Sequence, residues 1–292
     1  MIKLDIAHEN FIGHLKGQDR SNSTVIAYKK DIEQLIDHLF KEGVNLVNEI
    51  ETDHLESFMG ALAEKNYTNK SISRKTNSTK TFFRYLHGEG HIEENAADAL
   101  KHPKVTIKPP RILSRLEYGA LRDASKDDIR TFAIIEMLLQ TGIRISELAD
   151  IAMEHVEIEH ENELGTLFVP KRGRHEARTI PLNKAAIESV KRYLGEKPEV
   201  ETSTHLFITK TGNPLLVRNI RATLTRYFDN AGIEGATVND LRHTFVAHHL
   251  AQGTSLLTVS KIAGHKRIST TERYLEFIEK KTENEKAELG IL

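Results

Sequence analysis

The sequence has no cysteine among its 292 residues and no long apolar run. The lack of cysteine excludes disulfides, thiolate metal sites and a cysteine nucleophile, and it is compatible with a reducing compartment. No stretch approaches the roughly 18 apolar residues of a membrane span, and the opening segment MIKLDIAHENFIGHL lacks the uninterrupted apolar core of a signal peptide. We therefore expect a cytoplasmic protein with no membrane partner.

An excess of charge of one sign is also lacking, since 41 basic and 42 acidic residues give a net charge of −1. The total charge therefore does not predict a polyanionic partner. Only the distribution of the charges along the chain can indicate such a partner. From Asn66 to Arg84 the chain has no acid but five basic residues, namely Lys70, Arg74, Lys75, Lys80 and Arg84. This pattern predicts a phosphate-facing helix, although charge alone is equally consistent with a solvated helix face.

The length indicates two domains, because domains typically hold roughly 100–200 residues. In the first, residues 1–103, apolar residues recur at i, i+3 and i+4 and predict an all-helical domain. Ser23 is a candidate N-cap for one helix, and Thr52 or Asp53 for the next. A third helix ends at the HGEG segment, residues 87–90.

The segment KHPKVTIKPPR has three prolines and no helical period, so residues 104–111 are predicted to be an extended linker. Residues 112–292 form the second predicted domain. The runs HVEIEH, GTLFVP and ARTIPL predict three short antiparallel strands, and the rest predicts helices, including a charged C-terminal tail helix. The expected fold class is mainly α with a small antiparallel β-sheet, in two domains.

Several common catalytic motifs are missing. The sequence contains no GxxxxGK[ST] phosphate loop and no GxGxxG, HExxH or GxSxG motif. The spacings among His243, His248 and His249 do not place two imidazoles on one helical face. We therefore expect neither a metal nor a cofactor.

Basic residues at three separate places form a more specific pattern. Arg144 lies just after a glycine that ends a buried helix, and Arg242 lies near the start of another helix. A buried arginine requires a carboxylate or an anion, and two planar guanidinium forks suit the non-bridging oxygens of a phosphodiester transition state. His265 and Tyr274 follow, and a tyrosine hydroxyl can serve as the nucleophile.

At these residues the sequence resembles the tyrosine recombinases of the phage integrase family, most closely the short Xer-like members. The segments TGIRISEL, NDLRHTFVAHHLAQG and LTVSKIAGHKRISTTERY resemble the family's three catalytic boxes. The resemblance implies that Arg144 and Arg242 contact the scissile phosphate, that His265 donates a hydrogen bond to it, that Tyr274 is the nucleophile and that Glu147 supports the site.

Two positions depart from the family pattern. Asn239 stands where the second box usually has a histidine, and an amide cannot exchange a proton near neutral pH. The family's general-acid lysine lies in a β-hairpin turn, where this sequence offers Lys171, Arg172 and Arg174. Lys171 is the predicted acid, because an ammonium releases a proton far more readily than a guanidinium does.

The resemblance further implies a site-specific recombinase that cleaves and rejoins double-stranded DNA through a 3′-phosphotyrosyl bond and a Holliday junction. It also implies a two-domain clamp with a helical core-binding domain and a homo-tetramer on two DNA sites, with a second recombinase or accessory protein as a candidate partner. Three alternatives stay open. The first is a DNA-binding protein of this fold with impaired cleavage, which Asn239 would explain. The second is strand cleavage without exchange, as in type IB topoisomerases. The third and most distant is a metal-dependent hydrolase.

Overall fold

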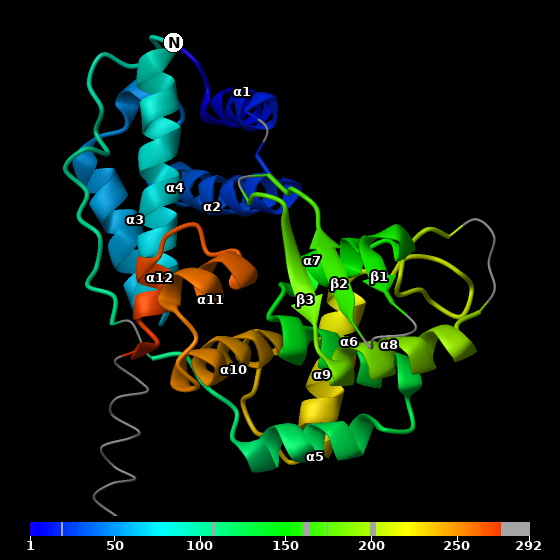
Figure 1. The fold of residues 1–292 in the computed structure, drawn as a ribbon. Coiled ribbons are helices and arrows are strands. Elements are labelled where there is room, and N and C mark those ends of the chain that lie inside the picture. The colour runs from blue at the N-terminus through cyan, green and yellow to red at the C-terminus, as the bar shows by residue number, and fades with distance from the viewer. Residues whose placement is uncertain (19, 107–108, 160–163, 174, 199–202, 276–292) are drawn as a thin grey trace, which may run out of the picture. The chain divides into compact units, whose positions relative to one another are not determined.

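A computed structural model describes residues 1–275, apart from residues 19, 107–108, 160–163, 174 and 199–202 (Figure 1). The chain forms two compact units, residues 1–107 and 108–292. The division falls inside the predicted linker, residues 104–111. The predicted tail helix lies largely beyond residue 275 and therefore outside the described residues.

The N-terminal unit is helical. Its elements are α1 (Leu4–Gly17), α2 (Asn22–Lys41), the 3-10 turn η1 (Val47–Glu49), α3 (Thr52–Glu64) and α4 (Asn69–Gly88). Their apolar faces share one core, with Phe11 and Phe82 among its fully buried side chains. This confirms the predicted helical character of the first hundred residues.

Two predicted helix caps are wrong. Helix α2 is capped by Ser21 and not by Ser23, because Asn22 and Ser23 already belong to the helix and the Ser21 hydroxyl accepts a hydrogen bond from the Thr24 backbone N–H at 3.2 Å. Helix α3 begins at Thr52, so Glu51 is its N-cap. The Thr52 hydroxyl donates to the Ala96 carbonyl instead of capping the helix.

The C-terminal unit is also mainly helical. Its elements are α5 (Arg115–Ser125), α6 (Ile129–Thr141), α7 (Ile145–Asp150), η2 (Met153–His155), β1 (Val156–Ile158), β2 (Gly165–Val169), β3 (Arg178–Leu182), α8 (Lys184–Glu196), α9 (Val217–Asn230), α10 (Val238–Ala251), α11 (Leu256–Ala263) and α12 (Ser269–Glu272). The three strands form one antiparallel sheet in the order β1-β2-β3, in which Leu167 pairs with Val156 on one side and Ile180 on the other. The predicted fold class, mainly α with a small antiparallel sheet, is confirmed.

Helix α6 organises this unit. Nine of its thirteen residues are buried, as its nearly all-round apolar sequence predicts. It packs against α8 on one side and α10 on another, and β3 lies against it as well. Since α6 leads directly into α7, this packing brings the start of α7 next to α10 and β3. Among the residues that the structure describes, no helix combines the length and the apolarity that a membrane crossing needs.

Candidate active site

Arg144 stands at the turn between α6 and α7. Gly142 ends α6 with a φ of +62°, and a Cβ at this position would lie 2.3 Å from the Phe245 ring of α10, so the turn requires glycine. Arg144 is the N-cap residue of α7, and its Nη1 donates to Glu147 Oε1 at 2.9 Å. Its Nη2 donates to the Gly264 carbonyl at 2.8 Å, which joins the first predicted box to the third.

Glu147 is the buried carboxylate at the centre of this arrangement. It is 5% exposed and accepts hydrogen bonds from the Arg144 backbone N–H at 2.8 Å and from both terminal nitrogens of Arg178 at 3.0 and 2.9 Å. Burial alone would raise its pKa. The hydrogen bonds from Arg178 and Arg144 and the charges of both guanidinium groups outweigh burial and lower the pKa of Glu147 to about 2.

Arg178 is a site residue that sequence reasoning missed. It lies on β3, at the same side of the strand as Ile180 and Leu182, and its Nε also donates to the Ile262 carbonyl at 2.7 Å. The alternation in RTIPL carried the signal, because an arginine on the buried face of a strand needs a carboxylate. Arg178 thereby fastens β3 to both Glu147 and the end of α11.

Arg242 is buried, whereas Arg144 is half-buried. Its Nη1 donates to the Gly142 carbonyl at 2.5 Å, across the contact between α10 and the end of α6. Burial, followed by the positive charges of Arg144 and Arg178, lowers the pKa of Arg242 to about 10, against the opposing charge of Glu147. The guanidinium remains protonated at neutral pH, and its surroundings favour an added anion.

His265 follows Gly264, which ends α11 in the left-handed region with a φ of +67°. A Cβ on Gly264 would lie 2.8 Å from the Arg178 guanidinium, so this close approach also requires glycine. His265 Nδ1 lies 2.8 Å from the Thr271 hydroxyl. Burial and the charges of Arg242 and Arg144 lower the pKa of His265 to about 3, so its imidazole is neutral at physiological pH.

Tyr274 lies two residues after the end of α12 and is 4% exposed. Its ring is nearly parallel to that of His265, with an interplanar angle of 15° and centroids 6.4 Å apart. Its hydroxyl lies 2.6 Å from Nδ1 of His243, a residue of α10 that the sequence analysis named only in rejecting a metal site. Burial raises the pKa of Tyr274, so the free chain holds a protonated phenol.

The two departures from the family pattern are both exposed. Asn239 is exposed at the second position of α10, and among the described residues its amide has no hydrogen-bond partner. Lys171 is exposed in the β2–β3 hairpin, with Glu176 3.4 Å away. Arg172 instead donates to the Ser146 carbonyl and pairs with Asp150 at 2.8 Å, whereas Arg174 lies outside the described residues.

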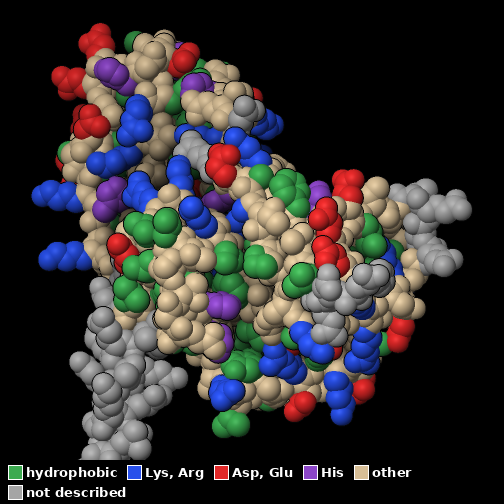
Figure 2. Space-filling model, in the orientation of Figure 1, with side chains coloured by type: hydrophobic (Ala, Val, Ile, Leu, Met, Phe, Trp, Pro, Cys, Tyr) green, Lys and Arg blue, Asp and Glu red, His purple; other side chains and the backbone are tan. Residues whose placement is uncertain are grey.

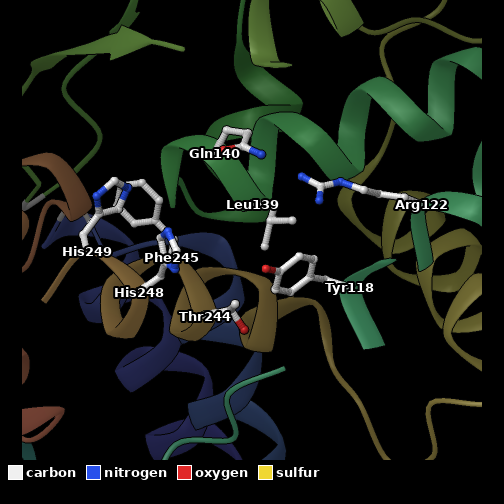
Figure 3. Close-up of a pocket in the computed structure, with 8 residues that line it drawn as sticks. All are labelled: Tyr118, Arg122, Leu139, Gln140, Thr244, Phe245, His248 and His249. Carbon is white, nitrogen blue, oxygen red and sulfur yellow. The ribbon is translucent and has the colours of Figure 1, made fainter. Parts of the chain in front are cut away.

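A separate small cavity of about 100 Å³ lies beside α10, between α5 and α6 (Figure 3). His248 and His249 line it, together with Arg122 and Gln140. Arg122 and Gln140 both donate to Glu136, so their polar groups are already satisfied within the protein. Among the described residues no cluster of His, Asp or Glu could hold a metal ion.

In the N-terminal unit the structure corrects the expectation for Lys75. Its side chain is buried at 3% exposure, and Nζ donates to Asp31 at 2.8 Å and to Gln34 at 2.5 Å. Asp31, itself 2% exposed on α2, needs a counter-ion inside the domain, and a second one comes from the half-exposed Arg74. Lys75 therefore has a structural contact and does not face a phosphate.

Of the other predicted DNA-contact residues, Lys70 is exposed and Lys80 donates to the Asp98 carbonyl at 3.2 Å. Arg84, the last basic residue of the same stretch, is also exposed. In the view of Figure 2, Lys and Arg side chains of this unit lie among acidic ones. The face in view is therefore mixed in charge. Lys70 and Arg84 are exposed basic residues of the same unit.

Comparison with known proteins defines the class to which this fold and site belong. The phage integrase family model matches residues 110–280, and the N-terminal SAM-like domain model of phage integrases matches residues 9–90. The chain belongs to the phage integrase family of tyrosine recombinases, which confirms the family predicted from the three boxes. It is an Xer-like member, and thus an enzyme that cleaves and rejoins DNA strands in site-specific recombination.

The relatives match along nearly their whole length. The chain is 30% identical over 288 residues to tyrosine recombinase XerC of Oceanobacillus iheyensis, covering 94% of this chain and 92% of the relative. It is 32% identical over 280 residues to XerC of Natranaerobius thermophilus, covering 91% and 92%. Among solved structures, a lambda integrase dimer bound to a COC′ core site has a TM-score of 0.76 at 16% identity, covering 94% of this chain and 77% of that one. XerH bound to a palindromic difH substrate also has a TM-score of 0.76 at 18% identity, covering 90% of this chain and 79% of that one. This chain therefore shares the fold of both structures.

Proposed function

We propose that this enzyme recombines a specific double-stranded DNA site with Tyr274 as its nucleophile. The Tyr274 oxygen forms a bond to the scissile phosphorus while the bond from phosphorus to the 5′-oxygen breaks. The products are a 3′-phosphotyrosyl protein and a DNA strand with a free 5′-hydroxyl. Because one phosphodiester replaces another, the reverse step rejoins the strands with no nucleotide cofactor and no metal.

The observation that carries this proposal is the convergence of three distant segments of the C-terminal unit. Arg144 donates to the carbonyl of Gly264, whose neighbour His265 stacks on Tyr274. Arg242 is held against the α6–α7 turn by its bond to Gly142. Two guanidinium groups, an imidazole and a phenol therefore belong to one site, which is the set that a phosphodiester cleavage by tyrosine requires.

Each group has a defined task in this proposal. Negative charge grows on the non-bridging oxygens in the transition state, and the remaining N–H groups of Arg144 and Arg242 stabilise it. The Thr271 hydroxyl donates to Nδ1 of the neutral His265 in this proposal, so the imidazole hydrogen is on Nε2. His265 then donates a hydrogen bond from Nε2 to the phosphate. Glu147 does not react but fixes Arg144, together with Arg178.

Lys171 is the proposed proton donor to the leaving 5′-oxygen. Its ammonium is exposed in the hairpin and its contact with Glu176 is a surface ion pair, which costs little to exchange for DNA. Neighbouring Arg172 is already bound to the α7 segment and, as a guanidinium, is a poor acid. Replacing Lys171 by Ala should slow cleavage, and a substrate with sulfur in place of the 5′-bridging oxygen should restore the rate, because a thiolate leaves without a proton.

We further propose that the N-terminal unit holds the duplex through Lys70, Arg74, Lys80 and Arg84, so that the two domains clamp the DNA. Four copies of the chain on two sites would exchange strands, in the way suggested by a lambda integrase tetramer solved on a Holliday junction. A second recombinase or an accessory protein remains a candidate partner. We also propose a cytoplasmic location for this activity.

The test is a nicked suicide DNA substrate, which traps the covalent adduct. Tyr274→Phe should bind DNA but form no adduct. Arg144→Ala and Arg242→Ala should each slow cleavage by about 10²–10³, the usual effect of one lost transition-state donor. An adduct with Tyr274→Phe would refute the assignment, and relaxation of supercoils without strand exchange would indicate a topoisomerase-like activity instead.

A further inference from the structure

His243 occupies a position that the proposed mechanism has not used. It lies on α10 next to Arg242 and one helical turn after Asn239, and its Nδ1 is 2.6 Å from the Tyr274 hydroxyl. Its side chain is half-buried. Among the described side chains it is the hydrogen-bond partner of the phenol oxygen, which is the reacting atom.

A phenol that attacks phosphorus must lose its proton, and the buried Tyr274 holds that proton at neutral pH. Asn239 cannot take it, because an amide does not exchange protons in this range. His265 is also poorly placed, since its Nδ1 is engaged by Thr271 and its ring lies parallel to the Tyr274 ring instead of meeting the hydroxyl. The site therefore requires another base.

We propose that His243 is the proton acceptor that activates Tyr274, in place of the histidine that the family pattern has at position 239. This inference rests on the proposed role of Tyr274 as nucleophile. In the neutral tautomer with hydrogen on Nε2, the Nδ1 lone pair accepts the phenol hydrogen bond. The observed distance is within the range in which a base takes a proton directly.

The step balances as follows. The Tyr274 O–H bond breaks, its proton goes to His243 Nδ1, and its electron pair forms the bond to phosphorus. The bond from phosphorus to the 5′-oxygen breaks, and that oxygen takes a proton from Lys171. Rejoining runs in reverse, with the His243 imidazolium returning its proton to the tyrosine oxygen.

The electrostatic surroundings favour an unprotonated acceptor. Burial lowers the pKa of His243, the Arg242 charge lowers it further, and Asp240 opposes both. The facing groups from other elements are Tyr274 and His265, which are both neutral near pH 7. Because the pKa of His265 is lowered to about 3, a loss of cleavage on acidification that sets in well above pH 3 would report His243.

The first test compares His243→Asn with His248→Asn in the full-length chain on the nicked substrate. Asparagine keeps an amide near the Nδ1 position but accepts no proton, and His248 is an exposed residue of the same helix that lines the separate cavity. We expect His243→Asn to bind DNA normally, to cleave about 10²-fold or more slowly, and to lose the acid limb of the pH profile. His248→Asn should match the parent. Cleavage by His243→Asn within about threefold of the parent would overturn the proposal.

The second test separates proton transfer from mere positioning of the tyrosine. Fluorotyrosine at position 274, whose phenol is more acidic, should shrink the defect of His243→Asn, whereas a defect that stays the same size would show that His243 only holds the ring. The sulfur-containing substrate should leave the His243→Asn defect in place while it relieves that of Lys171→Ala. Relief of both would overturn the assignment of His243 to the nucleophile.

Tyr274→Phe in the same assay separates a failure of the proposed nucleophile from a failure of the proposed role of His243. If Tyr274→Phe still forms an adduct, the proposed nucleophile is wrong. If Tyr274 is required but His243→Asn cleaves normally, only the role of His243 is wrong.

Discussion

Replacement of Glu147 by Gln tests the charge arrangement at the centre of the site. The carboxylate is 5% exposed and receives four hydrogen bonds from Arg144 and Arg178, so the neutral amide would leave the two guanidinium groups without their anion. The lowering of the pKa of Glu147 from 4.5 to about 2 corresponds to about 3 kcal/mol of stability at neutral pH. We expect Glu147→Gln to lose about that much and to slow DNA cleavage, because Arg144 loses its anchor.

The sign of the pH dependence follows from the lowered pKa. A carboxylate with a lower pKa in the folded protein stabilises it fully above the unfolded value, and this contribution disappears as the pH falls through the folded value. The difference between the parent and Glu147→Gln should therefore shrink from about 3 kcal/mol at pH 7 to about 1 kcal/mol at pH 3. Urea unfolding followed by circular dichroism at both pH values measures it.

The matched control is Glu154→Gln, because the Glu154 side chain is 84% exposed. It should change stability by less than about 0.5 kcal/mol at either pH. A Glu147→Gln loss that is equally large at pH 7 and pH 3 would refute the electrostatic reasoning. It would mean that the amide fails to fit for reasons of shape.

Three further predictions concern substitutions at single positions. Gly264→Ala should destabilise the protein by about 1–3 kcal/mol and slow cleavage, because its Cβ would meet the Arg178 guanidinium. The control is Gly253→Ala, which has similar backbone strain but open space around the Cβ. Thermal unfolding and cleavage assays should both show a smaller effect for Gly253→Ala than for Gly264→Ala. Lys75→Met should lower the free energy of unfolding by about 3 kcal/mol without changing the salt dependence of DNA binding, whereas Lys70→Met should lower the salt slope by about 0.9 and leave stability unchanged. Equal salt slopes for the two would count against this division. Asn239→His should raise the cleavage rate a few-fold, since it adds a second proton acceptor on the same helix face as His243. The pH profile of cleavage should then gain a new limb near pH 6.5. A slower rate than the parent at every pH would place Asn239 outside the site.

The sequence by itself determined the family, the fold class and most of the helices. Periodicity located α2, α3 and α4 because the 3.6-residue repeat is a local property, and the nearly all-round apolar run predicted α6 as a buried helix. The strands of the sheet were equally readable, since each alternates over a few residues. Arg144, Arg242, His265 and Tyr274 could be picked out as candidates because their motif spacings are also written along the chain.

Only the tertiary structure decided which charged and polar groups meet. Lys75 appeared in a basic run typical of a DNA-binding helix, yet the packing of α2 against α4 turns it inward to Asp31. Arg178 lies outside the three boxes, and His243 lies inside the second box without a predicted role. Their roles follow from partners 31 residues away, Glu147 and Tyr274 respectively. The physical reason is that a buried charge or a reactive proton is controlled by atoms within a few ångströms, and the packing of distant segments chooses those atoms.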